Sequence, residues 1–88
     1  MTAIFIPDTL YGAKVKVLKQ EFKRVQGKVL IQLTKYGTKA YEVHIIRSYK
    51  GTFDKEPRYQ LATPEDFGTY AWYFLKKTEA LDKYESCL

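Results

Sequence analysis

The chain has 88 residues, which is enough for one small domain and too few for two. Hydrophobic residues make up 45% and charged residues 28%, so the composition excludes a disordered chain depleted in apolar residues. The formal net charge is +5, which favours an acidic partner over a basic one. We predict a single domain over residues 1–88.

Residues 14–49 show the alternation of apolar and polar residues that is typical of β-strands with one buried face. The alternation is clearest at 14–17, 28–34 and 41–46. A short connection with a glycine separates the second stretch from the third, and a longer one separates the first from the second. The pattern predicts three antiparallel strands joined as a meander.

The first of these strands contains an irregularity. Leu18 and Phe22 fall out of phase with Val15 and Val17, so a regular strand could bury only one of the two pairs. A β-bulge near Leu18 or Lys19 would bury both pairs and would also bend and twist the sheet. The sequence therefore predicts a curled sheet or half-barrel.

Two further segments flank the three strands. Residues 3–6 are apolar and precede Pro7, which has no amide hydrogen for a strand ladder, and we expect a short edge strand there. Residues 51–62 contain Gly51, Pro57 and four charged residues, and we expect them to form a mobile loop.

The C-terminal part begins with a helix start signal. Residues 63–66 (TPED) combine a capping residue, a proline and two acidic residues of a first turn. One helix over 64–87 would suit the apolar spacing, but Gly68 and the β-favouring run at 69–74 argue against it. We prefer a helical turn, a strand at 69–74 and a helix from about 77 to 87. The apolar stripe of that helix consists of Ala80, Leu81, Tyr84 and Cys87.

The predicted fold is α+β. It is a small, twisted antiparallel sheet of four or five strands in a meander, covered on one face by the C-terminal helix. The face that we assign to the helix contains Val15, Val29, Ile31, Leu33, Tyr41, Val43 and Ile45. The opposite face displays Lys14, Lys16, Lys28, Gln32, Thr34, Tyr36 and His44, together with Leu30 and Ile46.

No motif for catalysis, cofactor binding or metal binding is found. His44 is the only histidine and Cys87 the only cysteine. The sequence therefore lacks the histidine and cysteine cluster of a zinc site with four ligands, and it shows no arrangement of a nucleophile beside a histidine base. The five glycines are isolated and form no phosphate-binding loop. We expect no enzyme activity, no cofactor and no metal.

Cysteine usage and apolar run length predict a cytoplasmic protein. One cysteine cannot form an intramolecular disulfide, on which small secreted domains usually depend. The apolar run before Pro7 is too short for a signal peptide, and no stretch approaches the ~20 apolar residues of a membrane span. We expect no membrane interaction.

The charge is concentrated in one half of the chain. Residues 1–50 carry ten basic and three acidic side chains, a net of +7, whereas residues 51–88 carry five basic and seven acidic, a net of −2. This asymmetry indicates an acidic partner such as nucleic acid or attraction between the two halves of one domain. A third explanation is that the lysines lie on solvated strand faces and keep the sheet edges from aggregating.

Two functions fit these patterns. The first is protein association, as a homodimer or with a partner protein, through an outer patch made of Leu30, Tyr36, His44 and Ile46. The alternative is nucleic-acid binding through the basic face, with Lys14, Lys16, Lys28, Gln32 and Tyr36 as contact residues. We rank protein association first because it explains the outward apolar residues as well as the eight tyrosines.

Overall fold

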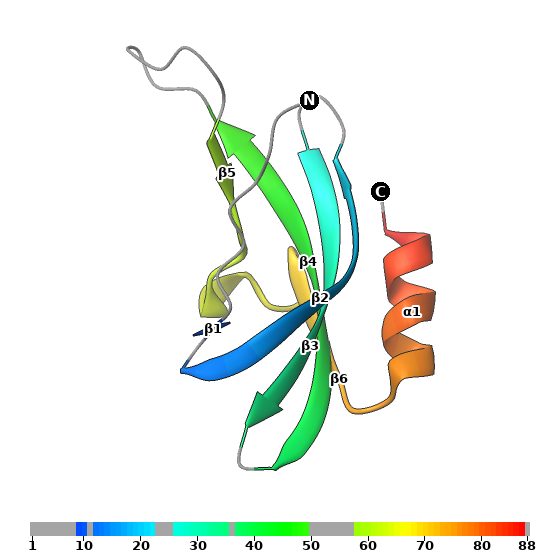
Figure 1. The fold of residues 1–88 in the computed structure, drawn as a ribbon. Helices are drawn as coiled ribbons and strands as arrows, with labels where there is room; N and C mark the ends of the chain where they lie inside the picture. The colour runs from blue at the N-terminus through cyan, green and yellow to red at the C-terminus, as the bar shows by residue number, and fades with distance from the viewer. Residues whose placement is uncertain (1–8, 11, 23–25, 36, 50–57, 88) are drawn as a thin grey trace.

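The computed structural model describes residues 9–10, 12–22, 26–35, 37–49 and 58–87. In this part of the chain a six-stranded antiparallel sheet carries one α-helix against one face (Figure 1). The elements are β1 (Thr9–Leu10), β2 (Ala13–Phe22), β3 (Gln26–Lys35), β4 (Thr38–Tyr49), β5 (Arg58–Gln60), the 3-10 helix η1 (Pro64–Asp66), β6 (Ala71–Phe74) and α1 (Lys77–Ser86). The predicted α+β class, with an antiparallel sheet and a C-terminal helix on one face, is confirmed.

Strands β1 to β5 follow one another across the sheet as a meander, and β6 returns to pair with β4. The two short strands β5 and β6 share the outer edge of β4, because β6 pairs at 41–44 and β5 at 47–49. Strand β5 lies at the end of the segment that we expected to be a loop. The rest of that loop, at 51–57, and the edge strand expected at 3–6 lie outside the described residues.

The predicted order of helical turn, strand and helix at the C-terminal end is confirmed by η1, β6 and α1. Gly68 separates η1 from β6 with a φ of +94°, in the left-handed region that other residues rarely adopt. Its amide donates a hydrogen bond of 2.7 Å to the carbonyl oxygen of Ala71. A single helix over 64–87 does not form because this turn interrupts it.

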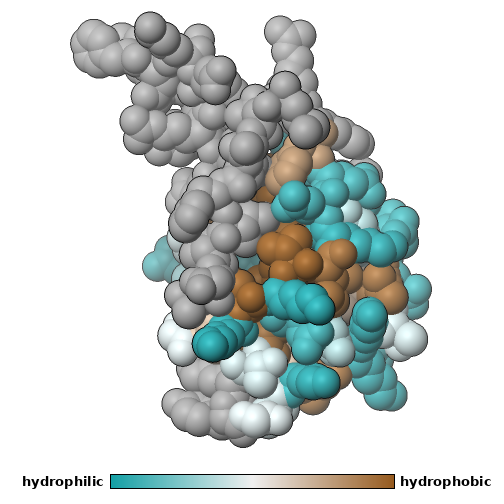
Figure 2. All heavy atoms as spheres, viewed as in Figure 1, coloured by the Kyte–Doolittle hydropathy of each residue, from teal (hydrophilic) through white to brown (hydrophobic). Residues whose placement is uncertain are grey.

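Strand β2 contains the predicted bulge. Val17 pairs with Ile31 and Lys19 with Leu30, so Leu18 is the extra residue. The bulge turns Leu18 toward one face of the sheet and returns Phe22 to the face of Val17. Among the coloured residues of Figure 2, hydrophilic side chains lie mainly on the right and an apolar area lies in the middle of the view.

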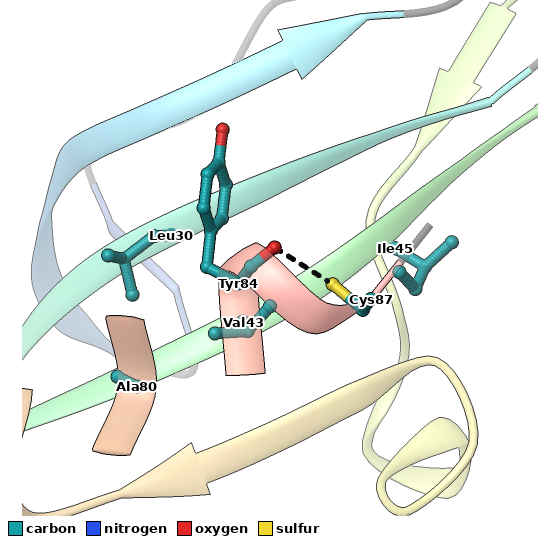
Figure 3. Packing of buried hydrophobic residues seen from close by; sticks show 6 residues of the cluster. All are labelled: Leu30, Val43, Ile45, Ala80, Tyr84 and Cys87. Carbon is teal, nitrogen blue, oxygen red and sulfur yellow. Dashed lines mark hydrogen bonds between the residues drawn. The ribbon is translucent and has the colours of Figure 1, made fainter. Parts of the chain in front are cut away.

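Apolar residues are buried on both faces of the sheet. On the helix face, Leu30, Val43 and Ile45 pack with Ala80, Tyr84 and Cys87 (Figure 3). On the far face, Val29, Ile31 and Ile46 pack with the partly buried Leu10, Val15, Val17, Phe22 and Leu61. The centre of β3 is therefore a continuous apolar run, and its alternation does not identify one inner face.

The predicted assignment of side chains to faces is wrong for β3 and for Val15, Lys14 and Lys16 of β2. Val29 and Ile31 lie on the far face, whereas Val43 and Ile45 lie on the helix face. The cause is the turn between the strands, because Lys35 pairs with Thr38 across only two residues. A turn with an even number of residues pairs odd positions of one strand with even positions of the other. The odd positions of β3 therefore share a face with the even positions of β4.

Lys28 fixes the C-terminal end of α1. Its Nζ donates hydrogen bonds to the carbonyl oxygens of Tyr84 (2.5 Å) and Cys87 (3.1 Å), and it lies 4.5 Å from the centre of the Tyr84 ring. Carbonyl groups at the end of a helix lack partners within the helix, and a cation there also complements the helix dipole. The buried ammonium group of Lys28 thus holds the helix against β3.

Candidate functional site

The four residues predicted as a protein interface do not form an exposed patch. Leu30, His44 and Ile46 are each 0% exposed. Leu30 packs against α1 on the helix face, whereas His44 and Ile46 belong to the far face. Tyr36 lies outside the described residues. The predicted patch is wrong because its members are buried on opposite sides of the sheet.

Three of the five residues predicted to contact nucleic acid lie together. Lys14 and Lys16 are exposed on the same face of β2, and Lys16 pairs with the half-buried Gln32 of β3. Lys28 lies on this same face, but α1 buries it, so its predicted role in binding is wrong. For Tyr36 the prediction falls outside the described residues.

Two rows of side chains cross the strands on the helix face, at the end of the sheet that contains Lys14 and Lys16. Neighbouring strands lie about 4.8 Å apart, so a row that crosses four strands spans about 14 Å. The longer row is Lys16, Gln32, Tyr41 and Phe74, and the shorter row is Lys14, Thr34 and Lys39. We call these seven residues the basic platform.

The basic platform carries three positive charges and no negative charge. Lys14, Lys16 and Lys39 are exposed, and none of them forms an ion pair with a described residue. Lys19, further along β2, instead pairs with Glu85 of α1 at 3.4 Å. The three unpaired cations are available to an anionic ligand.

Two aromatic rings complete the basic platform. Tyr41 and Phe74 are directly opposite each other on β4 and β6. Both are half-buried and pack against the helix-face core. Rings that are held rigidly beside cations can stack with nucleic-acid bases. Sequence reasoning missed both rings and Lys39, although the even length of the turn before β4 could have placed Lys39 and Tyr41.

An ion-pair network positions β6 and therefore Phe74. The carboxylate of Asp66 accepts hydrogen bonds from the backbone amide (2.9 Å) and the hydroxyl (3.1 Å) of Thr63, and from Arg47 of β4 (2.6 Å). The hydrogen bond from the Thr63 amide, helped by Arg47, holds the pKa of Asp66 below its usual value. The guanidinium of Arg47 also lies 4.3 Å from the centre of the Tyr70 ring. These contacts tie the segment before β6 to β4.

A second polar group is buried on the far face. Nε2 of His44 lies 2.8 Å from Oε1 of Glu42, and the two side chains are 0% and 4% exposed. Nδ1 of His44 has no hydrogen-bond partner among the described residues, and the ring makes an edge contact with Phe67. A histidine and an acid can catalyse a reaction only where substrate reaches them. At this degree of burial we assign the pair to the core.

Comparison with known proteins found no match among protein-family models, curated proteins or solved structures. Within the described ranges, no three side chains of the metal-binding types come together. Neither helix described here combines the length and apolar character that a membrane span requires.

Proposed function

We propose that the protein binds single-stranded nucleic acid through the basic platform. One observation carries this proposal: the strand register places three lysines, none of them ion-paired with a described residue, on the same face of the sheet as Tyr41 and Phe74. Lysines contact phosphates without reading sequence, and aromatic rings stack with bases. Protein association through the outer patch loses its support, because the apolar residues of that patch are buried.

A single strand suits the basic platform better than a duplex does. In a duplex the bases stack on each other, so a protein ring can stack only on a base that is unpaired or displaced. The platform holds no histidine, cysteine or carboxylate, which are common groups in acid–base catalysis. We therefore propose a binding protein without catalytic activity, and its single cysteine favours a reducing cytoplasm.

The first test removes the charges of the basic platform. The triple variant Lys14→Ala, Lys16→Ala, Lys39→Ala should bind a labelled single-stranded oligonucleotide much more weakly at about 0.15 M salt. The slope of log affinity against log salt should also become shallower by about 2, because each phosphate contact contributes about 0.7 for single strands. Fluorescence anisotropy over a salt series measures both quantities.

The control for this test has the same change in net charge. Lys19→Ala, Lys77→Ala, Lys83→Ala removes three lysines outside the basic platform and should leave most of the slope unchanged. Equal losses in the two triple variants would mean that the basic platform has no special role. A wild-type protein that binds no oligonucleotide at about 0.15 M salt would remove the proposal altogether.

Protein association is a second proposal, now at a different surface. Tyr73 and Leu75 are 51% and 64% exposed, and they are the exposed large hydrophobic residues of the described chain. They lie on and just after β6, whose outer edge pairs with no other described strand.

Light scattering should show that the wild type is a dimer. Leu75→Glu should convert the dimer to a monomer, because the substitution places an unpaired charge in the contact. A monomeric wild type at high concentration would contradict self-association.

A further inference from the structure

Gln32 is the central polar side chain of the basic platform. It lies between Lys16 on β2 and Tyr41 on β4. The side chain is half-buried, and its amide makes no hydrogen bond with any described residue. The amide is not among the buried polar atoms without a partner, so it remains accessible from solvent. The amide is therefore free to bond with a ligand.

The position of Gln32 places this amide beside the proposed stacking ring. Directly opposite residues of antiparallel strands have their Cβ atoms about 5 Å apart. A base that stacks on Tyr41 would bring its edge within reach of the Gln32 side chain. The amide offers one donor and one acceptor side by side, so it suits a base edge that offers the reverse pair.

Adenine offers that reverse pair on two edges. Its N6 amino group is a donor, and it is flanked by the acceptor N7 on one edge and by the acceptor N1 on the other. Guanine presents two acceptors, O6 and N7, on the corresponding outer edge. Guanine can still match the amide through O6 and N1–H. Pyrimidines have no N7 and can match it only along the Watson–Crick edge, so the expected preference is for adenine over the pyrimidines. On the basis of the proposed function, we infer that Gln32 reads the edge of the base stacked on Tyr41 and favours adenine.

The test compares labelled oligoadenylate, oligocytidylate and oligouridylate of equal length, at about 0.15 M salt. Wild type should bind the adenine strand about fivefold more tightly than the other two. This factor is at the lower end of the discrimination that a bidentate contact provides, because the site is open to water. Gln32→Leu keeps a similar side-chain size without the amide. It should lower the preference for the adenine strand, mainly by weakening the binding of oligoadenylate.

Two controls separate this contact from other sources of preference. Stacking itself favours a purine, so the comparison that matters is the ratio of affinities in Gln32→Leu against that in wild type. Gln20→Leu makes the same change at an exposed glutamine of β2 that lies on the far face, outside the basic platform, and should keep the adenine preference. Circular dichroism checks that each variant folds, and Gln32→Met replaces Gln32→Leu if the leucine variant does not.

The outcomes distinguish this inference from the proposed function. Equal binding of all three strands by wild type, or an unchanged preference in Gln32→Leu, would overturn the role of Gln32 while single-strand binding stands. Absence of binding to all three strands would overturn both. An adenine preference that falls in Gln32→Leu and stays unchanged in Gln20→Leu would support the inference.

Discussion

Leu30→Ala should lower the free energy of unfolding by about 2–5 kcal/mol, which is the largest effect that we expect from a single truncation. The Leu30 side chain is 0% exposed and packs with Tyr84 and Ala80 of α1. A typical domain has a free energy of unfolding of about 5–15 kcal/mol, so this loss is a large fraction of the total. Urea unfolding followed by circular dichroism measures it.

The control for Leu30 is another leucine. Leu75 is 64% exposed, and Leu75→Ala should change the free energy of unfolding by no more than about 0.5 kcal/mol. Leu30→Glu should cost more than Leu30→Ala, because it places a carboxylate where an apolar side chain is fully buried. Similar midpoints for Leu30→Ala and Leu75→Ala would show that α1 does not pack on Leu30.

Glu42→Leu should destabilise the protein by about 3 kcal/mol, although it replaces a charged residue by an apolar one in the core. The carboxylate of Glu42 is the hydrogen-bond partner of Nε2 of His44, and Nδ1 has none among the described residues. The substitution therefore leaves a buried imidazole with neither nitrogen bonded to a described residue. Urea unfolding of the single variant gives the cost.

A double-mutant cycle separates this cost from a loss of packing. Glu42→Leu, His44→Leu removes both polar groups together, so it should be more stable than Glu42→Leu alone. If the two single losses simply add in the double variant, the pair contributes nothing beyond its volume, and the assignment of an interaction between the two side chains fails.

Local signals in the sequence were sufficient for β2, β3, β4, β6 and α1 and for the bulge. The capping residues at 63–66 and Gly68 placed a turn before β6, and the phase change at Leu18 placed the irregularity in β2. Each of these features depends on residues only a few positions apart. The three-residue β5 was missed because it lies in a polar segment where pairing with β4, and not its composition, makes it a strand.

The candidate site depends on longer-range information. Lys16 and Gln32 were found because both lie on the polar side of their strands. The sequence does not say where α1 lies along the sheet, so nothing in it separates the buried Lys28 from the exposed Lys16. Phe74 reaches the basic platform only because β6 returns to β4, a pairing that no local pattern indicates.

The two-residue turn between β3 and β4 fixes the register of the two strands. A shift of this register by one residue would turn every side chain of β4 to the other face, moving Val43 to the far face and His44 to the helix face. Each face has its own core, so neither exchange would be tolerated. Strand β2 accommodates one extra residue, because the bulge at Leu18 restores the alternation after it. A one-residue change of alternation is therefore compatible with this fold in β2 and not between β3 and β4.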